Sequence, residues 1–264
     1  MDTYAFQGGT EGASRLQIID QAFGPHSRSC LLEAGLREGT KVLEVGCGTG
    51  SMTSWIARTV GSAGSVLAID ADPRQVELAR AVLAANRATN VELRCGRVPD
   101  VQLPEGTFDL VYARLVLMHI RHPEAALAAM VQALRPGGVV VCEEAASTTA
   151  FAYPPKEAVA RTARLFEELG RRIGAAYDIG DRLYDLVRAA GCEVLRASFV
   201  QPIVSLAVAS RFLLIGANEV RPLVLKTGLL TEQDADELMT ALGNLATDEG
   251  YYAFARVAQV IGKR

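Results

Sequence analysis

The feature that most constrains the fold is a short apolar run followed at once by closely spaced glycines, in the segment VLEVGCGTG at 42–50. Aliphatic and β-branched residues in a run of this length predict a buried strand. Glycine is favoured where the backbone turns sharply or approaches a ligand closely, because a Cβ would collide there. We therefore expect a strand, a tight turn and a helix, with a ligand in the crevice at the carboxyl end of the strand.

Short apolar runs alternate with helical patterns over the front two-thirds of the chain. The expected strands are residues 41–45, 66–70, 91–95, 108–113 and 138–143, and the expected helices are 52–60, 72–87 and 122–134. The second helix has a clear start, with Asp72 as N-cap and Pro73 in the first helical position. Almost wholly apolar strands that alternate with helices predict a parallel sheet covered on both faces.

The rhythm differs at the two ends of the chain. Residues 12–35 predict two short helices broken at Gly24-Pro25, and Pro222 is expected to end a helix that begins at 210. Thr231 opens a further helix with a capping pattern. The other expected elements are helices 154–173, 180–190 and 231–245 and strands 193–200 and 251–261. Without repeats or a linker, we expect one domain over residues 1–264.

Net charge, cysteine content and hydropathy indicate which classes of partner are not expected. The net charge of −3 gives no general attraction to phosphate backbones, so a nucleic-acid partner is not expected. Five scattered cysteines without a Cys-x-x-Cys pair predict reduced thiols, a cytoplasmic location and no metal site. No apolar run approaches the roughly 20 residues that cross a bilayer, and the start of the chain does not read as a signal peptide, so no membrane partner is expected.

The spacing of the glycines selects the ligand. A dinucleotide fingerprint is Gly-x-Gly-x-x-Gly, whereas here the glycines run Gly-x-Gly-x-Gly and follow Glu44. A carboxylate aimed into the loop is a poor neighbour for pyrophosphate and a good one for an ammonium group. S-adenosylmethionine (SAM) carries an ammonium and no phosphate. A second acid, Asp70, ends the next expected strand, where a carboxylate can accept both ribose hydroxyls.

Four segments in order, VLEVGCGTG, VLAIDADP, FDLVYARLVLMHIRHPE and LRPGGVVVCEE, together resemble class I SAM-dependent methyltransferases. The resemblance covers roughly 41–144 and points to the small-molecule branch that contains ubiquinone- and menaquinone-type and natural-product enzymes. It implies an α/β Rossmann-like fold: a seven-stranded, mostly parallel sheet with helices on both faces and an antiparallel last strand. It also implies a SAM-binding core at 41–144, an N-terminal helical lid at 1–36 and helical cap insertions at 147–179 and 204–250.

The resemblance also assigns roles to matching positions. Glu44 and the 46–50 loop would hold the methionine part of SAM, Asp70 the ribose, and Ala71 would lie beside the adenine. Arg97 stands where the family has an acid, and a guanidinium cannot accept a hydrogen bond from the adenine amine. Val98 would keep its backbone contact. The full set of expected cofactor-binding residues is Glu44, Gly46, Cys47, Gly48, Gly50, Asp70, Ala71, Arg97, Val98 and Arg114.

Three residues are candidates for catalysis, each with a structural alternative. Tyr4 resembles part of a lid segment, or it only packs at the N-terminus. His119 has a side chain that titrates near neutrality and is a candidate base, or it is structural. Glu143, with its neighbour Glu144, ends the fifth strand at the expected pocket mouth, or it is an exposed strand end. Many such transfers need only positioning and desolvation.

The leading hypothesis is methyl transfer to a small organic acceptor, with S-adenosylhomocysteine (SAH) as product. Phe151, Tyr153, Phe166 and Phe212, together with Leu213 and Ile215, are expected to make the acceptor cover apolar. The alternatives are a SAM-binding regulatory protein without activity, a protein or peptide methyltransferase, and an unusual SAM reaction such as cyclisation. Alanine, arginine and glycine richness favours secondary metabolism. A homodimer is left open.

Overall fold

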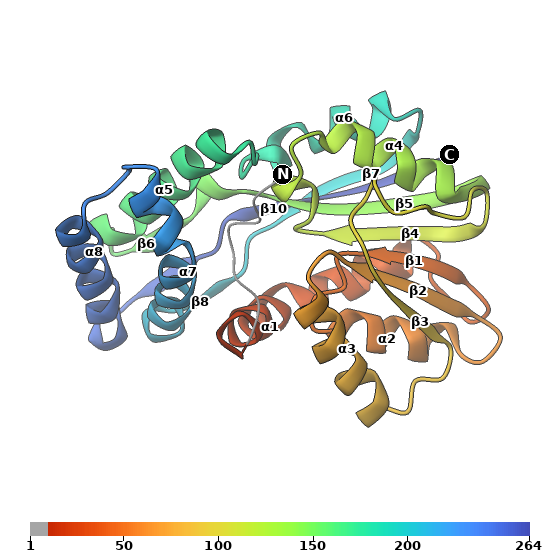
Figure 1. The fold of residues 1–264 in the computed structure, drawn as a ribbon, viewed down its shortest axis with the longest axis horizontal. Coiled ribbons are helices and arrows are strands. Elements are labelled where there is room, and N and C mark those ends of the chain that lie inside the picture. Colours follow the sequence, from red (N-terminus) through yellow and green to blue (C-terminus); the bar gives the residue numbers. More distant parts are fainter. Residues whose placement is uncertain (1–9) are drawn as a thin grey trace.

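The computed structural model describes residues 10–264, and side chains from 12 onward. Its central sheet has seven strands in the order β3-β2-β1-β4-β5-β10-β7 (Figure 1). They are β1 (Lys41–Val45), β2 (Ser65–Asp70), β3 (Val91–Cys95), β4 (Phe108–Arg114), β5 (Leu134–Ala146), β7 (Glu193–Val200) and β10 (Arg256–Lys263). Neighbours from β3 to β5 are parallel, and β10 runs antiparallel to both β5 and β7. The predicted sheet, with its antiparallel last strand, is confirmed.

Helices cover both faces of this sheet (Figure 1). On one face lie α1 (Thr10–Glu33), α2 (Ser51–Val60) and α3 (Pro73–Ala85). On the other lie α4 (Pro123–Ala133) and α6 (Leu183–Ala189). Short 3₁₀ turns link the elements: η1 (Leu117–His119), η2 (Ser147–Thr149), η3 (Ile179–Arg182) and η4 (Leu245–Thr247).

The alternation of side chains along each strand makes two apolar cores. In β4, Leu110 and Tyr112 belong to the core beneath α1 and α2, whereas Val111 and Ala113 belong to the core on the opposite face. This follows from the two-residue period of a strand. Because both faces are buried, the central strands contain almost no exposed position. Side chains that can contact a ligand therefore lie at the ends of the strands.

A cap extends from one end of the sheet (Figure 1). It consists of α5 (Glu157–Ile173), α7 (Leu206–Lys226), α8 (Glu232–Asn244) and a small antiparallel sheet of order β6-β9-β8, with β6 (Phe151–Tyr153), β8 (Ile203–Ser205) and β9 (Tyr251–Ala253). The expected single strand at 251–261 is therefore wrong, because the chain leaves the cap as β9 and enters the main sheet as β10.

Two proline predictions are also wrong. The helix α1 continues through Pro25, and α7 continues through Pro222. A proline inside a helix removes one hydrogen bond and costs about 3 kcal/mol. Apolar residues beyond each proline are buried, Leu31 in α1 and Val224 in α7, and this packing offsets the local cost.

Two predicted helix starts are confirmed by their hydrogen bonds. The Asp72 side chain accepts from the backbone N–H of Arg74 at 2.9 Å, with Pro73 in the first turn. Thr231 and Asp234 form a reciprocal capping box at the start of α8. Caps of this kind depend only on residues two or three positions apart, which is why the sequence predicts them well.

Within the described part of the chain, no helix combines the length and the apolar character that crossing a bilayer requires.

Candidate active site

The glycine loop at 46–50 is held by the neighbouring strand. The N–H groups of Gly46 and Cys47 both donate to the carbonyl of Ile69 in β2, at 2.7 and 3.0 Å. Gly46, Gly48 and Gly50 all have positive φ, of 76°, 53° and 80°. A Cβ on Gly46 would lie 2.3 Å from Cγ2 of Val116, so the loop passes another segment with no room for a side chain.

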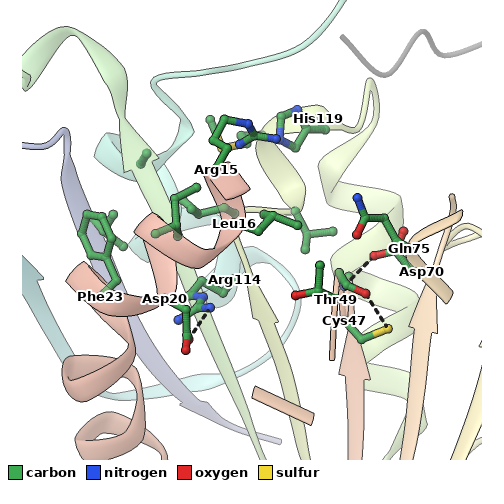
Figure 2. Close-up of a pocket in the computed structure, with 18 of the residues that line it drawn as sticks. Arg15, Leu16, Asp20, Phe23, Cys47, Thr49, Asp70, Gln75, Arg114 and His119 are labelled. Atoms are coloured by element: carbon green, nitrogen blue, oxygen red, sulfur yellow. Dashed lines mark hydrogen bonds and ion pairs between the residues drawn. The ribbon is translucent and has the colours of Figure 1, made fainter. Parts of the chain in front are cut away.

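The loop opens into a cavity of about 570 Å³. One part of its wall, here called the polar end, is formed mainly where strands β1, β2 and β4 finish. The polar end comprises Asp20, Glu44, Gly46, Gly48, Asp70, Asp72 and Arg114. The other part, here called the aromatic end, comprises Phe23, Phe166, Tyr177, Phe212, Tyr252 and Phe254. Figure 2 shows part of the wall, with Asp70 and Cys47 on one side and Phe23 on the other.

Glu44 is a buried acid on β1. Its side chain lines the cavity, the residue is only 3% exposed, and Oε2 has no hydrogen-bond partner among residues 10–264. Burial raises the pKa of this carboxyl from its ordinary 4.5 to about 7, against the opposing effects of the Thr53 hydroxyl and of the Arg114 charge. A buried carboxylate in this state has an unmet need for a cation or a donor.

Asp70 ties two loops together. Its Oδ2 accepts from the N–H of Gly48 at 2.8 Å and its Oδ1 from the N–H of Asp72 at 2.9 Å. Burial raises its pKa, while these two backbone hydrogen bonds pull in the opposite direction. The carboxylate therefore stands fixed between the glycine loop and the start of α3, facing the cavity.

Most of the other residues that were predicted to bind the cofactor lie on the cavity wall. Cys47, Ala71, Arg97, Val98 and Arg114 all line the cavity. The Arg114 guanidinium donates to Asp20 Oδ1 and to Ser27 Oγ, each at 3.2 Å, which links β4 to α1.

Gly50 is the exception in that set. It is not part of the cavity wall, and a Cβ there would lie 2.9 Å from the Cβ of Ala79 in α3. The structure therefore gives Gly50 a packing role between α2 and α3.

His119 lines the cavity from η1. Its ring packs edge-to-face on Tyr177 with centroids 5.4 Å apart. Burial, with a contribution from the Arg15 charge, lowers its pKa from 6.5 to about 3. The imidazole is therefore neutral at physiological pH and a weak base. Tyr4, the other candidate near the cofactor, lies outside the described residues.

Glu143 is not part of the cavity wall. It is 1% exposed and accepts hydrogen bonds from Ser27 Oγ at 2.6 Å, Tyr112 Oη at 2.7 Å and Gln259 Nε2 at 2.5 Å. These donors come from α1, β4 and β10, so the carboxylate fastens three elements together beside the polar end.

Glu144 also lies off the cavity wall, in contrast to the expected pocket mouth. Its carboxylate accepts from the backbone N–H groups of Val116, Leu117 and Met118 at 2.9, 2.7 and 3.2 Å. Burial raises its pKa to about 7 despite these three bonds. It holds the η1 turn, and through it the position of His119.

The aromatic end joins segments that are far apart in the chain. Phe254 packs on Phe23 at 5.4 Å, on Phe212 at 5.0 Å and on Tyr252 at 5.1 Å, each edge-to-face. Predicted wall residues Phe166, Phe212 and Leu213 do line the cavity, and Ile215 does not.

For Phe151 and Tyr153 the prediction is wrong. They are 46% and 60% exposed, because strand alternation in β6 turns Ala152 inward instead.

Sequence reasoning missed several wall residues, among them Asp20, Phe23 and Gln75. The positions in α1 follow a helical period, with Arg15, Ile19 and Phe23 on one stripe and Leu16 and Asp20 on the next. That spacing is present in the sequence, but nothing local shows which stripe faces a cavity.

The class of protein follows from this geometry and from comparison with known proteins. Residues 42–138 match the family described as "Methyltransferase domain". A demethylmenaquinone methyltransferase from Staphylococcus aureus is 34% identical over 117 residues, which are 44% of this chain and 48% of that protein. This chain thus spans about half the length of the curated relatives it matches.

Solved structures agree on the fold. A SAM-dependent methyltransferase from Aquifex aeolicus has a TM-score of 0.51 at 22% identity, covering 64% of this chain and 81% of that one. The [4+2]-cyclase SpnF has a TM-score of 0.55 at 22% identity, covering 90% of this chain and 80% of that one. Residues 42–138 thus match a methyltransferase domain, on a fold shared with solved SAM-dependent methyltransferases, and SAM is the cofactor of that class.

Proposed function

We propose that this protein transfers a methyl group from SAM to a small, largely apolar or aromatic organic acceptor. The observation that carries the proposal is a single cavity with two chemically different ends, one lined by buried carboxylates at strand ends and one by aromatic rings. A transferase needs both partners in one water-poor space, in contact at the reacting atoms.

The polar end fits the cofactor. An ammonium group beside Glu44 would supply the hydrogen bonds that Oε2 does not receive from residues 10–264. At Gly48 a Cβ would meet only Cδ1 of Leu16, at 3.3 Å, so the bare backbone leaves space on the cavity side. We propose that Glu44, Gly46, Cys47 and Gly48 hold the methionine part.

Asp70 is the proposed acceptor for the ribose hydroxyls, because a carboxylate has more lone pairs than its two backbone donors use. Ala71 and Val98 are proposed to enclose the adenine. Arg97 lies on the same wall and is proposed to stack on the adenine face. Arg114 is proposed to set the charge at the methionine end, close to Glu44.

Catalysis is proposed to rest on positioning. When bound, SAM supplies an electrophilic methyl group, so the chain's task is to orient the acceptor and exclude water. With a pKa of about 3, His119 suits the role of a neutral hydrogen-bonding group better than that of a strong base. Glu143 is proposed to act as a positioning residue through its hydrogen bonds to Ser27 and Tyr112.

The cap is proposed to determine the acceptor. Residues 147–179 and 204–250 would serve as insertions into one domain of 264 residues, over a SAM-binding core at 41–144, with 1–36 as the N-terminal lid. Supporting this, Phe166 of α5 and Phe212 and Leu213 of α7 line the cavity.

Two measurements test the proposal in order. Calorimetry with SAM and SAH asks whether the polar end binds the cofactor, and absence of heat for both on folded protein would refute the function. Mass analysis after incubation with SAM and a panel of aromatic acceptors should then show a gain of one methyl. Binding without any methylated product across small, peptide and protein acceptors would favour a regulatory SAM-binding role, and a rearranged product of unchanged mass a cyclase role.

The setting of this activity is part of the same proposal. Cytoplasmic location, a role in secondary metabolism, independence of nucleic acid and membranes, and a homodimeric state all remain expectations from the sequence. Light scattering on the purified protein tests the oligomeric state directly, since a dimer doubles the mass.

A further inference from the structure

Tyr252 is the central residue of β9, and its side chain faces the inner side of the cap. In the small sheet it pairs with Ala152 of β6 and Val204 of β8. Neighbouring residues of a strand face opposite sides, so Tyr252 lines the cavity whereas Tyr251 stacks on Tyr153 on the outer side. One tyrosine of this strand thus belongs to the cavity wall, and the residue before it does not.

Two phenylalanine rings fix the orientation of the Tyr252 ring. The Phe254 ring packs on it edge-to-face with centroids 5.1 Å apart, and the Phe212 ring of α7 lies 6.4 Å away at an interplanar angle of 39°. All three residues line the cavity. Because the ring is packed before a ligand arrives, its hydroxyl can form a hydrogen bond at little further cost in side-chain entropy.

Three other hydroxyl groups on the cavity wall donate their proton inside the protein. Ser147 donates to a backbone carbonyl at 2.7 Å, Thr162 to another at 2.8 Å, and Tyr112 to a buried carboxylate at 2.7 Å. A hydroxyl has a single proton to donate. These three groups therefore have no donor to offer to a ligand.

The hydroxyl of Tyr252 differs from these three. Burial alone raises the pKa of its phenol, and neither a hydrogen bond nor a charge from residues 10–264 contributes to that shift. Oε2 of Glu44 is an unpartnered oxygen that protein atoms enclose fully, and Oη of Tyr252 is not among the described atoms of that kind. The phenol is therefore a neutral donor with an uncommitted proton, open to the cavity that its residue lines.

A neutral donor among aromatic rings favours one class of ligand oxygen. An uncharged oxygen that accepts this hydrogen bond leaves neither group unpaired in an apolar space, where an unpaired polar group is costly. An ionic oxygen would need a compensating charge, and no charge from the described residues acts on the Tyr252 phenol.

Resting on the proposed function, we propose that the acceptor carries an uncharged oxygen on its aromatic or apolar body, and that the Tyr252 hydroxyl donates a hydrogen bond to this oxygen. A carbonyl and a hydroxyl share this chemistry. Phe212 and Phe254 hold the phenol in place and offer a flat body the edge and face contacts it prefers. Tyr252 is thus a specificity-determining residue, and no proton is transferred.

The test compares probes of similar shape on the SAH-loaded protein. Dissociation constants are measured for 2-acetylnaphthalene, 1-(2-naphthyl)ethanol and 2-ethylnaphthalene, which lacks the oxygen. Tyr252→Phe removes the hydroxyl and keeps the ring, so the preference for the ketone or the alcohol over 2-ethylnaphthalene should fall by about 3- to 10-fold. Affinities for SAH and 2-ethylnaphthalene should stay within about twofold. Whichever oxygen loses its preference identifies the source.

Tyr251→Phe is the matched control. It removes a phenol hydroxyl from the preceding residue of the same strand, on the outer side, and should leave every preference unchanged. The charged 2-naphthoate should bind less tightly than 2-acetylnaphthalene, because its charge would be buried without a partner. In infrared spectra, the carbonyl stretch of bound 2-acetylnaphthalene should move to lower wavenumber in the wild type and not in Tyr252→Phe.

Four outcomes would overturn the inference: an unchanged preference in the folded Tyr252→Phe variant, an equal loss in Tyr251→Phe, tighter binding of 2-naphthoate than of 2-acetylnaphthalene, or no probe binding at all. If Tyr252→Phe does not fold, the infrared shift in the wild type decides, and its absence overturns the inference. Heat from SAH is recorded first, so a failure of the cofactor site, which refutes the proposed function, is separate from a failure at Tyr252.

Discussion

The two ends of the cavity are built in different ways. The polar end comes mostly from residues 44–114, in chain order along the ends of adjacent strands, and its key groups are fixed by backbone hydrogen bonds such as those from Gly48 and Asp72 to Asp70. The aromatic end brings together side chains from α1, α5, α7, β9 and adjacent loop segments, and their rings pack on one another. The polar end suits a ligand that every member of a class shares, such as a cofactor. The aromatic end suits a ligand that differs among members, such as an acceptor.

Burial acts in opposite directions at the two ends. It raises the pKa of Glu44 to about 7 and lowers that of His119 to about 3, because in each case it disfavours the charged form. The polar end is thus prepared to receive a cation, whereas His119, which packs on Tyr177 of the aromatic end, stays neutral. The contrast predicts that changes at one end leave binding at the other end largely intact.

The largest effect is expected at Gly48. With φ of 53°, Gly48→Val would strain the backbone and put a branched side chain into the cavity. We expect SAH binding to weaken by at least about 100-fold, or about 2.7 kcal/mol. The control is Gly106→Val, which has a φ of 59° and open space around it; it should bind SAH normally. Near-normal SAH affinity in Gly48→Val would break the assignment of the polar end.

Asp70→Ala should have the next largest effect. Loss of the proposed ribose hydrogen bonds, and of the tie between Gly48 and Asp72, should weaken SAH by about 1–3 kcal/mol in calorimetry. Asp109→Ala is the control, since Asp109 accepts from the Lys41 N–H at 2.7 Å at the opposite end of the same sheet. An unchanged dissociation constant for Asp70→Ala would show that the ribose lies elsewhere.

A pH effect is expected at Glu44. The pKa of the Glu44 carboxyl in the ligand-free protein is about 7, so the carboxyl is protonated when the pH is below that value. It must lose this proton before it can pair with an ammonium group. SAH affinity should therefore rise with pH by at most about 10-fold per unit below pH 7, then level off. Glu44→Gln should abolish this slope. A slope of the opposite sign, or one that persists in the variant, would assign the titration to another group.

The smallest effect is expected for Phe166→Leu at the aromatic end. Replacing a partly buried ring by a shorter apolar side chain should lower the free energy of unfolding by about 1 kcal/mol. SAH affinity should stay within about twofold, while binding of an aromatic probe weakens. A large loss of SAH affinity would mean that the two ends are coupled through the cap, and the comparison would need revision.

The polar end could be predicted from sequence because its information is local. Strand, glycine turn and acid follow one another within nine residues at 42–50, and the parallel sheet then places the end of β2 beside the loop. The caps at Asp72 and Thr231 were predictable for the same reason. Gly50 shows where local sequence is not sufficient. It belongs to the Gly-x-Gly-x-Gly pattern, but its close approach to Ala79 in α3 gives it a packing role.

What the sequence by itself determined is the alternation of strands and helices and the chemistry at the strand ends, because periodicity and turn residues act over a few positions. Only the tertiary structure decided that α1 and α7 pass through their prolines, that Glu143 is tied into a hydrogen-bond network, and that Arg15 meets Glu219 204 residues away. Such long-range pairs leave no local pattern, since their energy appears only when packing removes both groups from water.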